Sequence, residues 1–133
     1  MVPNLGLMPT CDPIGRIETP FADPSDAPSQ GEHTGAEGVL RIDPTYRAAM
    51  DGIDSGDHID VLWFGHRADR TVLRYPDREI GVFSLRTMDR PNPIGVTPCV
   101  VTGRDGTELT VRGVDMVDGT PLLDVKPTLE HDR

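Results

Sequence analysis

Short segments in which apolar and polar residues alternate are the feature that most constrains the fold of this chain. Such alternation is typical of strands with one buried face. Residues 59–64 form a more continuously apolar run, which predicts a central strand. Gly, Pro or Asp residues punctuate most of these segments and favour turns between them. The predicted strands cover residues 14–19, 38–42, 59–64, 71–75, 80–84, 94–102, 109–113 and 121–125.

One short helix is expected among these strands. Asp43 and Pro44 suit the N-cap and first helical position, and Gly52 ends a helix that runs to Met50. The Asp105-Gly106 pair favours a hairpin. Because long helical crossovers are absent, the strands should pair antiparallel, which predicts an all-β fold, a mainly antiparallel β-barrel with one short helix. The sequence has no Gly-x-Gly-x-x-Gly between a strand and a helix, which argues against a Rossmann domain.

With 133 residues the chain has room for one domain, which we place at 13–133 after an irregular lead-in, 1–12. Aromatic residues make up only 5%, so Trp63, Phe64 and Phe83 are expected to serve a core built mainly from Val, Leu and Ile. No apolar run approaches the roughly 20 residues of a membrane span, and the N-terminus does not resemble a secretory signal. We therefore expect a cytoplasmic protein without a membrane partner.

Charge is distributed unevenly along the chain. Thirteen basic and 22 acidic residues give a formal charge of −9, which repels a polyanion at long range. Residues 67–90 nevertheless contain six arginines and four acids, so this window carries +2. Such an arginine-rich island could hold an anionic ligand, or its arginines could pair with neighbouring carboxylates on a solvated face.

The cysteines and histidines give no sign of a metal. Cys11 and Cys99 lie far apart, and the four histidines are scattered without a metal-binding spacing. We predict no metal site, and a reduced intracellular protein is the default.

Residues 81–95 are the first of two segments whose residue pattern suggests more than a structural role. A strand leads into Arg90-Pro91-Asn92-Pro93, where both prolines have a fixed φ and the residues before them avoid the helical region. Rigid backbone and side-chain groups of this kind suit a ligand site, although Pro-Asn-Pro also makes an ordinary structural turn.

Residues 113–127 are the second such segment. Asp118-Gly119-Thr120-Pro121 is typical of a tight turn that feeds a strand. The plain alternative to a ligand site is a turn aspartate at Asp118 that bonds to its own backbone, with a modest Asp124–Lys126 pair on one strand face.

Together the two segments resemble the TrmO family, also called TsaA-like or YaeB-like. Gly81-Val82-Phe83 and Arg90-Pro91-Asn92-Pro93-Ile94-Gly95 are similar to that family's loop, and Asp118-Gly119-Thr120-Pro121 with Asp124-Val125-Lys126-Pro127 is similar to its tail. The opening strand, Pro28-Ser29-Gln30-Gly31 and Val61-Leu62-Trp63-Phe64-Gly65-His66 also agree. The likeness covers about residues 13–127.

The resemblance implies a methyltransferase that uses S-adenosyl-L-methionine (SAM) on a β-barrel and works as a homodimer. The family's best-known activity methylates threonylcarbamoyl-adenosine beside the tRNA anticodon. By analogy, the residues expected to contact SAM are Pro28, Ser29, Gln30, His66, Arg86, Asn92, Pro93, Val96, Asp115, Met116, Val117 and Asp118.

Chemistry suggests a role for several of these residues. Arg86 could bind a carboxylate through two hydrogen bonds, and Asp115 or Asp118 could take an ammonium group or ribose hydroxyls. His66 and Arg90 are the candidate catalytic residues, because imidazole can accept a substrate proton and Arg90 could hold an anionic substrate group. A histidine at the end of an apolar strand is, however, more often structural.

Departures from the family pattern bear on the substrate more than on SAM. Ser29 replaces an arginine, Met88 a proline and Thr128 the closing tyrosine, and longer bacterial relatives continue into a small C-terminal domain beyond the equivalent of Arg133. These changes leave three functions open: methylation of tRNA, methylation of an anionic small molecule, and SAM binding without catalysis.

Overall fold

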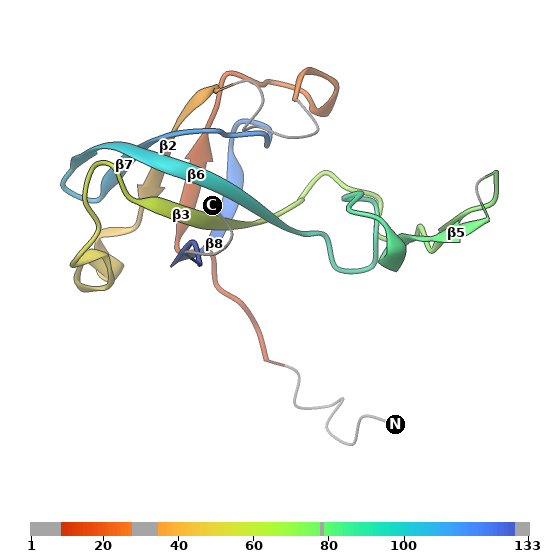
Figure 1. Ribbon diagram of the computed structural model, residues 1–133. Coiled ribbons are helices and arrows are strands. Elements are labelled where there is room, and N and C mark those ends of the chain that lie inside the picture. The colour runs from red at the N-terminus through yellow and green to blue at the C-terminus, as the bar shows by residue number, and fades with distance from the viewer. Residues whose placement is uncertain (1–8, 28–34, 78, 130–133) are drawn as a thin grey trace.

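The computed structural model describes residues 9–27, 35–77 and 79–129. Within them, six strands form a closed barrel in the order β1-β2-β7-β6-β3-β8, and every pair, including β8 with β1, is antiparallel (Figure 1). The predicted all-β barrel is confirmed. Its strands are β1 (Gly15–Glu18), β2 (Glu37–Ile42), β3 (His58–Phe64), β6 (Ile94–Asp105), β7 (Glu108–Arg112) and β8 (Thr120–Pro127).

Alternation along the strands fills the inside of the barrel. On β3, Ile59, Val61 and Trp63 are buried, whereas the residues between them are half-buried on the outer side. Strands β2 and β7 add Leu40 and Leu109, which are fully buried. Trp63 is the aromatic residue of the buried core in the described chain, and the expected core role of Phe83 is wrong because 84% of Phe83 is exposed.

The segment after Asp43 is a 3-10 helix, η4 (Pro44–Met50), with a break at Tyr46. The Asp43 carboxylate accepts a hydrogen bond from the Thr45 N–H at 2.9 Å, which lowers the pKa of Asp43 below its ordinary value. The predicted N-cap and Pro44 position are confirmed. Met50 at the helix end is buried against the barrel core.

Residues 65–93, which we call the arm, leave the barrel between β3 and β6 and project to one side (Figure 1). The predicted strands 71–75 and 80–84 are much shorter than expected, since only β4 (Arg74–Tyr75) and β5 (Ile80–Gly81) pair, and the 3-10 helix η5 (Val82–Ser84) follows. An isolated pair of strands buries little apolar surface, so little free energy is available to lengthen the pairing.

Two further observations complete the fold. The β6–β7 hairpin turns at Gly106, as the Asp-Gly pair predicted, but β6 continues to Asp105 rather than ending at residue 102. A short 3-10 helix, η2 (Pro24–Asp26), follows β1. Across the described residues, no helix is long and apolar enough to span a membrane.

Candidate functional site

A large cleft of about 1190 Å³ lies between one end of the barrel and the arm. Its walls come from the end of β3, the start of β6, the arm and the loop between β7 and β8. Parts of both segments that stand out in the sequence, 81–95 and 113–127, therefore border one cavity. This volume is somewhat above the roughly 300–1,000 Å³ of most small-molecule sites, so the cleft has room for a cofactor and part of a second substrate.

The Pro-Asn-Pro turn of the arm is held in place by Arg70. Its guanidinium donates hydrogen bonds to Pro91 O at 2.8 Å and to Asn92 Oδ1 at 3.1 Å. The same group lies 5.5 Å from the centre of the Phe64 ring, which is cation–π distance. Arg70 thus ties the arm to the end of β3 and fixes Asn92 beside the cleft.

Arg90 holds the turn that precedes the prolines. Its Nη1 donates to Leu85 O and to Thr87 O, both at 2.9 Å. Arg90 lines the cleft, but part of its guanidinium is used to order the arm. Its predicted contact with a substrate anion stays a prediction.

The loop between β7 and β8 is connected to the segment after β1. Thr19 donates its N–H to Asp118 Oδ1 at 3.0 Å and its hydroxyl to Met116 O at 2.8 Å. Gly119 follows with a φ of 83°, a conformation that glycine adopts without strain. Asp118 therefore bonds to a backbone N–H of a distant segment rather than to its own turn, and it is not among the residues that line the cleft. Its predicted contact with SAM stays a prediction.

Trp63, Thr97 and Asp115 form a hydrogen-bonded chain into the cleft. The Trp63 indole N–H donates to Thr97 Oγ1 at 2.9 Å, and the Thr97 hydroxyl donates to Asp115 Oδ1 at 2.6 Å. Opposite Trp63 in the ladder stands Gly95, where an added Cβ would lie 2.1 Å from an indole carbon. The indole of Trp63 can occupy this position because Gly95 has no side chain.

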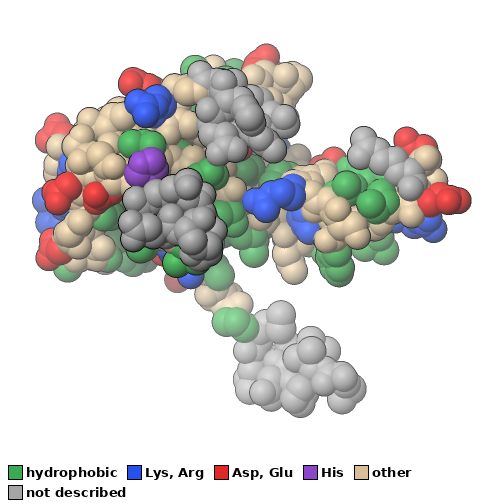
Figure 2. All heavy atoms as spheres, viewed as in Figure 1, with side chains coloured by type: hydrophobic (Ala, Val, Ile, Leu, Met, Phe, Trp, Pro, Cys, Tyr) green, Lys and Arg blue, Asp and Glu red, His purple; other side chains and the backbone are tan. Residues whose placement is uncertain are grey.

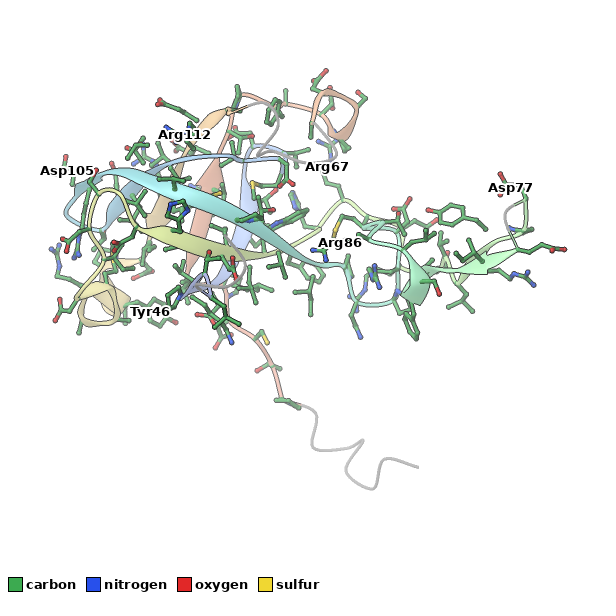
Figure 3. All side chains as sticks on the ribbon, viewed as in Figure 1. Tyr46, Arg67, Asp77, Arg86, Asp105 and Arg112 are labelled. Carbon is green, nitrogen blue, oxygen red and sulfur yellow. The ribbon has the colours of Figure 1, made fainter. Side chains whose placement is uncertain are left out.

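The arginines around the cleft differ in their surroundings. Arg67 donates hydrogen bonds to Ala22 O and to the Asp23 carboxylate, and Arg90 donates to two backbone carbonyls of the arm. Arg86 is exposed and has no hydrogen bond or ion pair to any residue that the structure describes. Figure 3 places Arg67 and Arg86 where the arm meets the barrel, with Asp77 at the far tip of the arm. Arg86 is therefore the cation best placed to bind an anion.

Apolar side chains are also exposed beside this site. Phe83, Ile94 and Val96 line the cleft and are exposed to 84, 50 and 43%. Figure 2 shows apolar side chains gathered on the arm and on the adjoining surface of the barrel, with basic side chains between them. Large exposed apolar side chains gathered beside a cleft commonly mark a binding face.

The structure brings most of the predicted site residues together. Those at the cleft are His66, Arg86, Arg90, Asn92, Val96, Asp115, Met116 and Val117. Pro93 is buried, and its carbonyl accepts the Gly65 N–H at 2.7 Å. Pro28, Ser29 and Gln30 lie outside the described residues.

Sequence reasoning missed Arg70 and Thr97, and it treated Trp63 only as a core residue. A threonine at an inward-facing position of β6, two residues from Gly95, was the available signal for Thr97. Burial, with the charges of Asp115 and Asp60, raises the pKa of the Cys99 thiol to about 12, which makes it unsuitable as a nucleophile. Over the described chain, no cluster of three His, Cys, Asp or Glu residues could hold a metal ion.

Comparison with known proteins decides the family. The model of the tRNA-methyltransferase O N-terminal domain, the TrmO N-terminal domain, matches residues 16–132. The chain belongs to the TrmO family. This membership confirms the resemblance of segments 81–95 and 113–127.

Relatives and solved structures of the TrmO family agree with this assignment. The chain is 41% identical to a Halobacterium salinarum protein named "Probable S-adenosyl-L-methionine-binding protein", with 89% of this chain and 97% of that protein covered. An Archaeoglobus fulgidus protein named "S-adenosyl-L-methionine-binding protein" is 36% identical, with 86% and 85% covered. A crystal structure of TrmO superposes with a TM-score of 0.82 at 31% identity, covering 93% of this chain and 59% of the other. The chain therefore spans about three fifths of that solved protein.

Proposed function

We propose that this TrmO-family protein is a methyltransferase that binds SAM in the cleft between the barrel and the arm. The observation that carries the proposal is that two segments typical of the family, well separated in sequence, border one cavity. Relatives of nearly the same length are named as SAM-binding proteins, which supports the choice of cofactor.

The residues of the cleft suit the chemistry of SAM. Its carboxylate needs a cation, and Arg86 offers an exposed guanidinium without a described partner. Its ammonium group and ribose hydroxyls need acceptors, and Asp115 places a carboxylate in the cleft. Val96, Met116 and Val117 give an apolar wall for the adenine ring.

When bound, SAM would supply a methyl group carried on a positively charged sulfur, and transfer would form a bond from the acceptor nitrogen to the methyl carbon as the opposite carbon–sulfur bond breaks and the neutral thioether leaves. The protein's contribution to such a transfer is mainly positioning and exclusion of water. His66 lines the cleft at the end of β3 and is exposed, so its imidazole can take the proton of the acceptor nitrogen. Arg90 would direct an anionic part of the acceptor.

For the acceptor we propose threonylcarbamoyl-adenosine in tRNA. The family description names a tRNA methyltransferase, and the acceptor's own carboxylate would suit the arginines at the cleft. A small anionic molecule is the second candidate. The chain's charge of −9 and the internal hydrogen bonds of Arg67 and Arg90 favour this alternative, because both reduce the positive surface available to a long polyanion.

We also propose that the active form is a homodimer. Phe83, Ile94 and Val96 expose apolar surface beside the cleft, and a second copy that covered them would also narrow its mouth. Sedimentation equilibrium tests this point. A monomer at micromolar concentration would contradict it.

Methyl transfer from labelled SAM tests the proposed function. Bulk tRNA from cells that contain threonylcarbamoyl-adenosine and tRNA from cells that cannot make it should be offered side by side, with a small-molecule extract as a third substrate. Label only in the first tRNA supports the proposed substrate. Label only in the extract would favour the small-molecule alternative, and SAM binding without any transfer would leave a binding protein.

A further inference from the structure

The direction of the hydrogen bonds in the Trp63–Thr97–Asp115 chain is fixed by chemistry. An indole N–H can only donate, so Thr97 Oγ1 must accept from Trp63 at 2.9 Å. A threonine hydroxyl has a single hydrogen, and at 2.6 Å that hydrogen goes to Asp115 Oδ1. The tryptophan thereby sets the rotation of the hydroxyl, and the hydroxyl sets the position of one carboxylate oxygen.

The first two members of this chain are held rigidly by the barrel. Thr97 is 2% exposed and lies on β6 opposite Val61, and Trp63 lies on β3 opposite Gly95. The absence of a side chain at Gly95 lets the indole lie across β6 and reach Thr97. Both residues therefore have well-defined side-chain positions before any ligand arrives.

Asp115 has a different setting. It lies in the loop between β7 and β8, outside any strand, and is half-buried at the cleft. A side chain on a loop needs support from a rigid element if it is to bind a ligand in one geometry. Thr97 supplies such support from the barrel wall.

We propose that Thr97, oriented by Trp63, is a positioning residue that aims the Asp115 carboxylate at the donor groups of the cofactor. This inference rests on the proposed binding of SAM in the cleft, and it assigns a functional role to two residues that otherwise belong to the barrel core. Asp115 is the binding residue, and Thr97 and Trp63 act through it.

The protein offers a direct spectroscopic reading of this chain, because Trp63 is its only tryptophan. The indole ¹⁵N–¹H group therefore gives one NMR resonance, and that N–H is the donor to Thr97. Asp115→Asn should shift this resonance in the absence of any ligand. The shift should disappear when Asp115→Asn is made in a Thr97→Val background, since valine cannot transmit the change.

Calorimetric titration with SAM measures the consequence for binding. Thr97→Val should weaken SAM affinity about tenfold, because the carboxylate loses a hydrogen bond that helps to orient it. Thr97→Ser keeps the hydroxyl and should restore most of the affinity. Thr102→Val is the matched control, since it removes a hydroxyl from the same strand that bonds to Thr110 O, away from the cleft.

The two measurements separate this inference from the proposed function. If wild-type protein binds no SAM, the proposed function fails, while the ligand-free indole shifts still test the chain of hydrogen bonds. An Asp115→Asn shift of equal size with Thr97 present and in the Thr97→Val background overturns the inference. So does unchanged SAM affinity in Thr97→Val, or an equal loss in Thr97→Val and Thr102→Val.

Discussion

The barrel and the arm are stabilised in different ways. In the barrel, side chains such as Ile17, Val61 and Leu109 alternate into a core from which water is excluded. The arm has a single two-residue ladder and depends on polar contacts, in which Arg70 and Arg90 bind backbone carbonyls and Asp89 accepts the Asp69 N–H. The barrel therefore provides fixed walls, and the arm brings charged groups to them.

Because of this difference, one wall of the cleft carries side chains in fixed positions and the other carries an exposed arginine. The barrel side contributes Thr97, which is buried, and Asp115, which accepts a hydrogen bond from Thr97. The arm side contributes Arg86, which is exposed and can adapt to an anion. Substitutions in the barrel should therefore change stability first, and substitutions in the arm should change binding first.

The largest effect is expected for Val61→Asp. Val61 is 0% exposed, so an aspartate there would bury an unpaired carboxylate at a cost of more than about 5 kcal/mol, comparable with the stability of a whole domain. Circular dichroism during thermal unfolding should show loss of the fold. The control is Leu73→Asp on the arm, where 68% exposure predicts little change. Normal melting of the Val61 variant would refute the assigned core.

Gly95→Ala should have the next largest effect on stability. Its Cβ would lie 2.1 Å from the Trp63 indole, and such overpacking costs about 1–3 kcal/mol. Urea unfolding measures the loss. Gly103→Ala on the same strand meets nothing closer than 3.8 Å and serves as the control. Equal losses in the two variants would argue against a special role for the Trp63 contact.

Arg86→Ala should reduce SAM binding by about 1.5 kcal/mol, since a hydrogen-bonded charge pair is lost, and should leave unfolding unchanged. Calorimetry gives the affinity, and Arg74→Ala is a matched arginine variant on the arm outside the cleft. Unchanged affinity in the Arg86 variant would remove this residue from the cofactor site.

Arg70→Ala should have the smallest effect, about 1 kcal/mol, because its hydrogen bonds and its contact with Phe64 are exposed to solvent. Hydrogen exchange should show faster exchange in the arm, for example at the Asp69 N–H that donates to Asp89 Oδ1. Barrel amides such as that of Val61 should be unaffected. Equal acceleration in both regions would mean that the arm and barrel unfold as one unit.

The sequence predicted the barrel more accurately than the arm. The barrel strands were found because alternation reports directly on a buried face, as at Ile59, Val61 and Trp63. Strands 71–75 and 80–84 were overextended, and Phe83 was misplaced, because β-favouring residues in the arm pack against no core. Residue preference alone could not reveal that the arm has no third strand.

The candidate site was predicted in outline but not in detail. The family resemblance indicated Arg86, Asn92 and Asp115, and the structure places all three at one cleft. The contacts of Arg70 and Thr97 depend on three-dimensional proximity between segments more than twenty residues apart, as in Arg70 with Asn92 or Trp63 with Thr97. The local pattern marks Thr97 as an inward-facing threonine, but it does not show which side chain Thr97 or Arg70 meets.

Chemical-shift mapping with SAM tests the central claim, that the cofactor binds where the arm meets the barrel. Titration of ¹⁵N-labelled protein should shift the Trp63 indole resonance and the amides of residues 94–97 and 115–120. Amides near Tyr46 and Asp105, at the opposite end of the barrel in Figure 3, should not change. Saturable SAM binding with shifts confined to that opposite end would contradict the account, as would the absence of any SAM-dependent shift.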